Sequence, residues 1–207
     1  MSRGLFVSLD GLDGAGKSTQ CRLLAEWLRA QGHTVETCSD PGSTSVGDRI
    51  RELLLSREMA LPCEALLFMA SRAQLVAEII RPALQAGKIV VSDRFLLANV
   101  AYQGHAGGID PEYLWSIGRF ATAGLEPDLT LVLDMPPPLA QSRRKVAADR
   151  VEHRDAAYHR RVRDGFLAEA QRKPEHIRVI DASGSVEAVQ EGIRQEVAHV
   201  LAAHPRT

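Results

Sequence analysis

The stretch that decides the fold is Leu5-Phe6-Val7-Ser8-Leu9-Asp10, followed at once by Gly11-Leu12-Asp13-Gly14-Ala15-Gly16-Lys17-Ser18-Thr19. The first segment is apolar enough for a buried strand, and the second matches G-x-x-x-x-G-K-[ST], the phosphate-binding P-loop. Glycines let backbone N–H groups turn inward towards an anion, and a helix-like run that follows adds its own unpaired N–H groups. We therefore expect residues 11–19 to bind a polyphosphate, Lys17 to reach its outer phosphates and Ser18 to ligate Mg²⁺.

A glycine-rich turn that ends in Lys-Ser by coincidence is the alternative interpretation of this stretch. Two fixed glycines, a lysine and a serine or threonine at these spacings should coincide in roughly one chain in a hundred of this length. The apolar strand before the loop and the helix-like residues 20–30 after it are what the motif requires. The phosphate-binding interpretation is therefore favoured.

The bulk composition indicates one ordinary globular domain. The 207 residues are 45% hydrophobic and 25% charged, with a formal net charge of −1, which suits a single domain with a sizeable core. This balanced charge argues against a broad nucleic-acid or membrane surface. No signal-peptide pattern opens the chain, and no apolar run has the length of a membrane span. We expect no nucleic-acid partner, no membrane and a cytoplasmic location.

Three cysteines, Cys21, Cys38 and Cys63, lie far apart in the chain. They form no C-x-x-C pair and have no histidine at a metal-ligand spacing. We interpret all three as free, buried thiols in a reducing compartment.

Strand-like and helix-like runs alternate along the whole chain. The expected strands are residues 4–10, 33–38, 88–93, 129–134 and 177–181, and the expected helices are residues 17–31, 46–56, 62–86 (kinked or divided at Pro82) and 185–203. Near-continuous apolar strands separated by helices indicate an α/β fold, with a parallel sheet covered on both faces. Ligands of such sheets bind beyond the carboxyl ends of the strands, where Asp10, Asp93, Asp134 and Asp181 fall.

Residues 141–173 are dense in charge. After Asp155 the pattern is typical of a solvated helical face with ion pairs between successive turns. Residues 143–150 carry several arginines directly after the fourth strand. In a protein that holds a polyphosphate, this basic segment is a natural lid.

Several later motifs resemble those of one family. They are Asp40-Pro41-Gly42-Ser43-Thr44, Ile50-Arg51-Glu52-Leu53-Leu54, Leu67-Phe68-Met69-Ala70-Ser71-Arg72, Ser92-Asp93-Arg94-Phe95, Ala101-Tyr102-Gln103-Gly104, Pro127-Asp128-Leu129-Thr130 and Asp149-Arg150-Val151-Glu152. Together with the P-loop they make the chain similar, over almost its whole length, to the thymidylate kinases, which move the γ-phosphate of ATP to dTMP. The resemblance implies one P-loop NTPase domain over residues 1–207, with a five-stranded parallel sheet, a lid at about 142–153, and a homodimer.

The resemblance also implies a binding site for dTMP. Phe68 and Arg72 are four residues apart, so they share one helix face, and in the family the aromatic ring stacks on thymine while the arginine bonds the base edge. Arg51 and Arg94 would grip the phosphate of dTMP, and Tyr102 would pack against the deoxyribose and exclude a 2′-hydroxyl. The expected substrate-binding set is Asp10, Arg51, Phe68, Arg72, Arg94, Asn99, Tyr102 and Gln103. Taken without the family, Phe68 and Tyr102 could be core residues and the arginines surface or ion-pair residues.

The remaining expected roles concern the metal and the moving phosphate. Asp93 would hold Mg²⁺ through water, together with Ser18, and Asp10 would lie between the two nucleotides, near the metal and the sugar. Some thymidylate kinases carry an arginine in the P-loop and others take it from the lid. This loop holds Asp13 and no arginine, so Arg150, and after it Arg144, would supply the catalytic charge, beside Lys17 and Arg94. Arg143 is expected to stack on adenine.

Several positions depart from the usual family pattern. Ser39 and Asp40 stand where the family usually reads Arg-Glu, Phe95 replaces a common tyrosine, and Ala98 stands where serine is frequent. A kinase for another nucleotide or for a deoxynucleoside is therefore an alternative function. A P-loop switch ATPase and an inactive binding module are further alternatives. The switch would need a water-positioning motif, which we do not find, and the retained Lys17, Ser18, Asp93 and Arg94 argue against the module.

Overall fold

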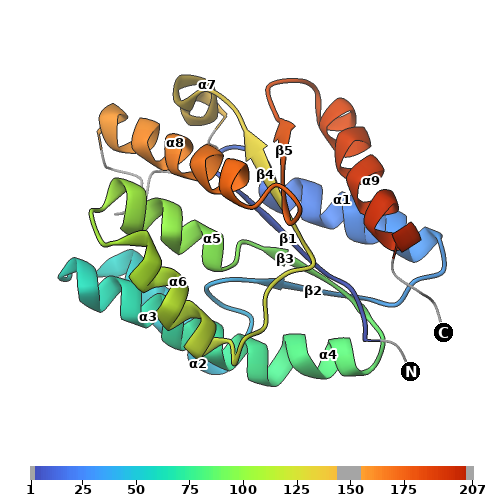
Figure 1. Cartoon of the computed structure of the whole chain (residues 1–207), viewed down its shortest axis with the longest axis horizontal. Coiled ribbons are helices and arrows are strands. Elements are labelled where there is room, and N and C mark those ends of the chain that lie inside the picture. Colours follow the sequence, from blue (N-terminus) through green and yellow to red (C-terminus); the bar gives the residue numbers. More distant parts are fainter. Residues whose placement is uncertain (1–2, 144–154, 204–207) are drawn as a thin grey trace.

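A single parallel sheet forms the centre of the molecule (Figure 1). The structure is a computed structural model that describes residues 3–143 and 155–203. Within these residues five strands lie in the order β2-β3-β1-β4-β5, all parallel. The strands are β1 (Phe6–Gly11), β2 (Val35–Ser39), β3 (Ile89–Asp93), β4 (Leu129–Asp134) and β5 (Ile177–Asp181). The α/β class and the five-stranded parallel sheet predicted from the sequence are confirmed.

Strand β1 lies in the middle of the sheet, and every one of its residues is buried. Its neighbours are β3, where Leu9 pairs with Asp93, and β4, where Asp10 pairs with Val132. Because β1 is covered on both faces, its two polar side chains, Ser8 and Asp10, are buried as fully as its apolar ones, and the Ser8 hydroxyl is bonded to the Thr130 hydroxyl at 3.0 Å. The register brings the carboxyl ends of β1 and β3 to one edge, directly below the loop that follows β1.

Helices cover both faces of the sheet. They are α1 (Lys17–Ala30), α2 (Ser45–Ser56), α3 (Leu61–Leu75), α4 (Arg81–Gln85), α5 (Leu96–Asn99), α6 (Pro111–Ala121), α7 (Pro137–Ser142), α8 (Ala156–Arg172) and α9 (Val186–Ala203), with π-helical segments η1 (Val76–Ile80) and η2 (Val100–Ala106). Helices α1 and α9 pack together on one face, whereas α4, α5 and α8 pack on the other (Figure 1). None of the helices in the described part of the chain is both long and apolar enough to span a membrane.

The long helix predicted over residues 62–86 runs without a break over residues 61–85, and it contains a π-helical segment shortly before Pro82. Helix α3 runs into the π-helical segment η1, and α4 begins at Arg81. Proline lacks an N–H, and its ring collides with the carbonyl four residues earlier in a regular helix. The wider turn of η1 lies immediately before Pro82 and relieves that collision.

The structure differs from the sequence analysis in several short helices, α5, α6, α7 and the segment η2, which were not predicted, and in one cysteine. Helix α6 was not predicted, although Asp110 caps it through a 2.8 Å bond accepted from the Glu112 N–H and Pro111 occupies its first turn. This is an ordinary helix-start signal. The prediction that all three cysteines are buried is wrong for Cys63, which is exposed at the start of α3, whereas Cys21 and Cys38 are buried. A cysteine in the first turn of a helix faces solvent whenever that side of the helix is uncovered.

Candidate active site

The loop between β1 and α1 has the geometry that the P-loop motif requires. Gly16 caps α1 with a φ of 90°, and Gly11 has a φ of 137° with the position of a Cβ only 2.5 Å from the Leu133 carbonyl oxygen. Both positions exclude other residues, the first by conformation and the second also by contact with β4. Lys17 is buried, and its Nζ donates to the Leu12 carbonyl at 2.8 Å. The P-loop therefore bends around the side chain of Lys17.

Asp13, in the middle of the loop, connects it to residues from distant parts of the chain. Its carboxylate accepts a 2.5 Å bond from Arg94 Nη2 and a 2.9 Å bond from the Tyr102 hydroxyl, and lies 3.8 Å from Lys17 Nζ. Burial opposes ionisation of Asp13, but Arg94 and Lys17 outweigh it and hold its pKa well below the usual range. Asp13 is therefore the counter-ion of two cations at the site.

Arg94 lies where β3 ends, and its backbone is in the left-handed region, with a φ of 71°. Such a conformation is uncommon for a residue other than glycine and is found mainly where a site demands it. The guanidinium lies 5.0 Å from the centre of the Tyr102 ring. Burial favours the neutral form of Arg94, yet the Asp13 carboxylate outweighs burial and keeps its pKa raised. Arg94 is thus a fixed cation between the P-loop and the neighbouring pocket.

Ser18 and Asp93 form a pair of oxygen donors at the edge of the P-loop. Ser18 Oγ donates to Asp93 Oδ2 at 2.5 Å. A hydroxyl beside a carboxylate suits Mg²⁺, which prefers oxygen and usually keeps several waters and substrate phosphates as its other ligands. Across the described residues no group of three or more His, Cys, Asp and Glu side chains could hold a metal. A magnesium ion completed by phosphates fits this sparse donor set.

Asp10 is the most enclosed acid of the site. It is fully buried, and neither carboxylate oxygen has a hydrogen-bond partner among residues 3–143 and 155–203. Burial raises its pKa to about 7, although Arg94 and Lys17 act in the opposite direction. An unpartnered buried carboxyl group is costly for the fold, so its place beside the P-loop indicates a ligand-facing role.

A pocket opens next to the P-loop, between β3, α2, α3 and η2. It holds about 620 Å³ of space, part of it open to solvent. Its lining residues are Asp13, Asp40, Pro41, Arg51, Leu55, Phe68, Arg72, Arg94, Ala98, Asn99, Tyr102 and Gln103. The structure therefore brings together every residue of the predicted substrate-binding set except Asp10, which lies beneath Arg94 at the end of β1.

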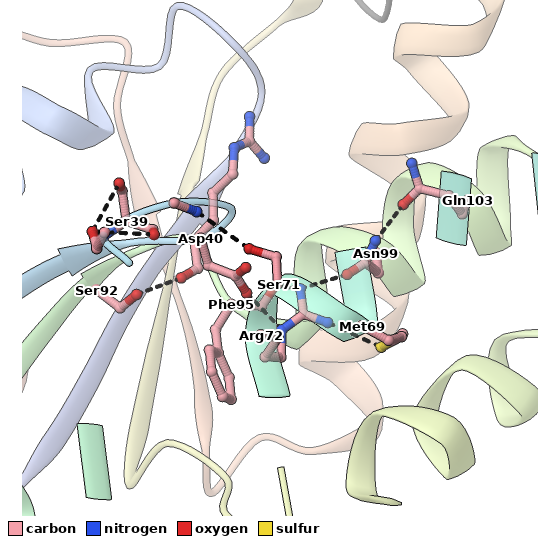
Figure 2. Close-up of polar contacts among 12 residues, drawn as sticks. Ser39, Asp40, Met69, Ser71, Arg72, Ser92, Phe95, Asn99 and Gln103 are labelled. Carbon is pink, nitrogen blue, oxygen red and sulfur yellow. Dashed lines mark hydrogen bonds and ion pairs between the residues drawn. The ribbon is translucent and has the colours of Figure 1, made fainter. Parts of the chain in front are cut away.

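Arg72 forms the base of this pocket and is held by buried partners (Figure 2). Its side chain is 1% exposed. Nε donates to Asp40 Oδ2 at 2.6 Å, Nη2 to Asn99 Oδ1 at 2.5 Å and Nη1 to the Met69 sulfur at 3.1 Å. The guanidinium also lies 5.3 Å from the centre of the Phe95 ring. Its plane is therefore fixed before any ligand arrives.

Other predicted residues are placed as follows. Arg51 Nη1 donates to the Pro41 carbonyl at 2.8 Å, at the mouth of the pocket. Arg143 donates to the carbonyl groups of Ala182 and Ser183, both at 2.7 Å, and so is bound to the loop after β5. Arg144 and Arg150, predicted in the lid, lie outside the described residues.

Two site residues were given no role by the sequence analysis: Asp40, which it noted only as part of a family motif and as a departure from the family pattern, and Glu64. Asp40 pairs with Arg72, and Glu64 accepts a bond from Gln103 Nε2 at 2.9 Å. Asp40 had one available signal, its place directly after a strand and before Pro-Gly. Glu64 had none, because a glutamate in the first turn of a helix is ordinarily a solvent-exposed residue.

Comparisons with known proteins agree with one another. The model of the thymidylate kinase family matches residues 9–193. The chain is 45% identical over 201 residues to a thymidylate kinase of Symbiobacterium thermophilum, covering 95% of this chain and 94% of the relative. It is 46% identical over 200 residues to that of Thiobacillus denitrificans, covering 96% of each. A crystal structure of thymidylate kinase from Ehrlichia chaffeensis matches with a TM-score of 0.79 and 28% identity, over 95% of this chain and 99% of that one. With the P-loop and the adjoining pocket in place, these matches establish that the chain belongs to the thymidylate kinase family.

Proposed function

We propose that this protein transfers the γ-phosphate of ATP to dTMP, giving dTDP and ADP. The observation that carries the proposal is the direct contact between the two sites, because Arg94 pairs with Asp13 of the P-loop and also lines the adjoining pocket. A phosphate donor in the loop and a phosphate acceptor in the pocket would meet at this arginine. Membership of the family supports the same reaction.

Different residues of the site would position the two nucleotides and the metal ion. Lys17 and the loop backbone would hold the β- and γ-phosphates, while Arg51 and Arg94 would hold the phosphate of the acceptor. Phe68 and Arg72 would bind the base, and Tyr102 would pack against the sugar. Ser18 and Asp93 would hold Mg²⁺, which when bound neutralises charge that develops on the phosphates. Phosphoryl transfer needs such alignment and positive charge more than covalent help.

Three roles in this scheme rest on the sequence analysis. Asp10, which is buried and has no hydrogen-bond partner in the described part of the chain, would meet the acceptor sugar or the metal. Arg150, and after it Arg144, would balance the transition-state charge from a lid at about 142–153. Arg143, which donates to the Ala182 carbonyl in the loop after β5, would stack on adenine.

A substrate panel tests the function. Purified protein is incubated with Mg·ATP and, in separate reactions, dTMP, dUMP, dCMP, dGMP and thymidine, and ADP release is measured together with the phosphorylated product. We expect dTMP to have the highest kcat/KM. Equal rates across the panel would favour a different nucleotide kinase, and ATP hydrolysis that needs no acceptor would favour a switch ATPase.

We further propose a cytoplasmic homodimer that binds neither nucleic acid nor membrane. Five of the seven large hydrophobic residues exposed in the described part of the chain lie on the three helices α2, α3 and α6: Val46, Leu53, Leu66, Tyr113 and Phe120. These helices pack side by side, α2 on α3 and α3 on α6 (Figure 1). Apolar residues that gather on neighbouring helices mark a protein interface more often than a solvated surface.

A further inference from the structure

The left-handed backbone of Arg94 is bonded to a buried hydroxyl group, that of Ser92. Ser92 lies near the end of β3 and is fully buried. Its Oγ donates to the main-chain carbonyl of Arg94 at 2.6 Å (Figure 2). Arg94 has a φ of 71°, a conformation that residues with a Cβ disfavour because the Cβ crowds the carbonyl oxygen that follows it. The hydroxyl therefore bonds to a carbonyl group whose position depends on this strained conformation.

The peptide group before Arg94 is held by main-chain bonds to two other segments. The Asp93 carbonyl accepts from the Asp40 N–H at 3.0 Å, and the Arg94 N–H donates to the Leu9 carbonyl at 2.9 Å. Because a peptide group is planar, the next free rotation is φ of Arg94, about its N–Cα bond. This rotation moves the Cβ and the carbonyl carbon of Arg94 together. A bond that holds the carbonyl therefore restricts φ, and with it the direction in which the side chain leaves the main chain.

The contacts of the Arg94 guanidinium hold a different part of the residue. Nη2 donates to Asp13 at 2.5 Å and to the Tyr102 hydroxyl at 3.4 Å. A phosphate that reaches the guanidinium would compete for the same N–H groups. Ser92 is not among the residues that line the pocket, and its partner is a main-chain carbonyl. Its bond can therefore persist while the guanidinium exchanges one anionic partner for another.

We propose that Ser92 is a positioning residue for phosphate binding, which holds Arg94 in its left-handed conformation and so keeps the guanidinium between the P-loop and the pocket. Without the hydroxyl, the Arg94 carbonyl loses this donor, and the backbone strain favours rotation to a negative φ. That rotation would carry the Cβ, and the guanidinium with it, away from the acceptor phosphate. The proposal rests on the proposed function, since it takes the phosphate of the acceptor to be the group that Arg94 binds.

The first test compares equilibrium binding of dTMP and of thymidine to wild-type protein and to Ser92→Ala. The two ligands differ only in the phosphate, so the ratio of the thymidine Kd to the dTMP Kd isolates what the phosphate contributes. We expect this ratio to fall by about tenfold in the variant, the size of one weakened bond between charged groups, while the thymidine Kd stays within about twofold of wild type. An unchanged ratio would overturn the role of Ser92. Wild-type protein that binds dTMP no more tightly than thymidine would instead contradict the proposed function.

Ser8→Ala is the matched control, because Ser8 lies opposite Ser92 in the register of β1 and β3 and is likewise fully buried. Its Oγ is bonded to the Thr130 hydroxyl at 3.0 Å rather than to Arg94. Each substitution removes one buried hydroxyl bond from the same sheet, so both should lower the melting temperature by a similar amount. The Kd ratio should change in Ser92→Ala alone. An equal fall in Ser8→Ala would assign the effect to a weakened sheet and contradict the proposal.

Crystal structures test the conformation of Arg94 directly. In Ser92→Ala without ligand, Arg94 should leave the left-handed region, completely or as a second conformer, whereas Ser92→Thr retains the hydroxyl and should keep a positive φ. A Ser92→Ala crystal with Arg94 wholly in the left-handed region would refute the proposal. Wild-type crystals with dTMP give an answer even if Ser92→Ala does not fold. The Ser92 hydroxyl should still bond to the Arg94 carbonyl there, and a Ser92 side chain turned away from it would equally refute the proposal.

Discussion

The side chain of Lys17 is buried, and its two polar contacts described here are with residues of the P-loop. Its Nζ is 2.8 Å from the Leu12 carbonyl oxygen and 3.8 Å from Asp13, and burial together with the nearby Arg94 lowers its pKa. Keeping a charge there costs the fold free energy. Asp13 offsets part of this cost, and an anion bound in the loop would offset more of it.

Replacing Lys17 by alanine should therefore separate activity from stability. We expect kcat to fall by about 100-fold or more, since one preorganised charge on the moving phosphate is lost, while the melting temperature changes little because Asp13 keeps its bond to Arg94. Steady-state kinetics and thermal denaturation measure the two effects. Lys88→Ala, which removes a half-exposed pair with Glu36, is the control. A Lys17→Ala enzyme with near-normal kcat would exclude the assigned role.

The raised pKa of Asp10 predicts how the free energy of unfolding depends on pH. Its folded pKa of about 7 lies above the ordinary value of 3.8, so the folded protein retains a proton that the unfolded chain releases. The free energy of unfolding therefore decreases as pH rises from about 4 to about 7 and stays low above that. Asp10→Asn abolishes this penalty. Its stability advantage over wild type should grow by about 2 kcal/mol between pH 5 and pH 8, as measured by urea unfolding without nucleotide.

Asp13→Asn is the control for that experiment. The pKa of Asp13 is held below its usual range, so this acid is ionised in both folded and unfolded protein throughout pH 5–8. The difference between Asp13→Asn and wild type should not change over this window. A difference for Asp10→Asn that is equally flat would mean that Asp10 has a hydrogen-bond donor in solution.

Among single residues, the sequence predicts the role of a residue when that role follows from spacing to its neighbours in the chain. Lys17 and Ser18 belong to a contiguous motif, and Phe68 and Arg72 share a helix face by their separation alone. Glu64 and Asp40 could not be predicted in the same way. Their partners, Gln103 and Arg72, are 39 and 32 residues away in the chain, and no local pattern encodes such a pairing.

Between elements, the closest packing near the site is that of α8 on η2. Gly165 of α8 faces His105 of η2, and a Cβ on Gly165 would lie 2.6 Å from the His105 Cβ. Since η2 also carries Tyr102 and Gln103, the position of α8 determines where these side chains enter the pocket. Glycine permits this approach because it lacks a side chain.

Gly165→Ala should therefore push η2 out of place. We expect a loss of about 1–3 kcal/mol of unfolding free energy from overpacking, together with a higher KM for dTMP and a smaller change in the KM for ATP. Gly192→Ala in α9 is the matched control, since the nearest atom to its Cβ would be Ile180 Cγ2 at 3.6 Å. That variant should gain up to about 1 kcal/mol from helix propensity. Equal stability of the two variants would contradict this account of the packing.

The elements themselves were predicted unevenly. Strands and the helices α1, α2 and α9 came within two residues of the observed bounds, because apolar periodicity and terminal glycines are local signals. Helices α5 and α6 and the segment η2 were not predicted. A four-residue helix that continues as a π-helix has no periodicity of its own, and its shape is set by packing on α6 and α8.

At the scale of the whole molecule, the exposed apolar residues of α2, α3 and α6 determine the expected oligomeric state. Sedimentation or light scattering of the wild-type protein should give twice the 22.6 kDa chain mass. Phe120, which is 86% exposed, is the side chain that a partner would cover most. A double variant, Phe120→Glu with Leu66→Glu, should sediment as a monomer, because an interface does not tolerate two unpaired charges.

The control variant for the dimerisation experiment changes a residue outside α2, α3 and α6. Val186 is similarly apolar and 46% exposed, but it begins α9. Val186→Glu should leave the dimer intact. A wild-type protein that is monomeric at micromolar concentration, or a double variant that still dimerises, would show that α2, α3 and α6 do not form the interface.

The bond between Asp13 and Arg94 has a consequence for the selection of anions. Arg94 has a negative neighbour within the protein itself, Asp13 at 2.5 Å, so a phosphate that reaches Arg94 must share or replace an existing counter-ion. A small free ion such as sulfate or inorganic phosphate gains little from that exchange. A nucleotide brings a base and a sugar whose contacts add to the same exchange, and its larger binding energy can pull the pair apart. We therefore expect the site to bind simple anions weakly and to favour molecules that fill the whole pocket.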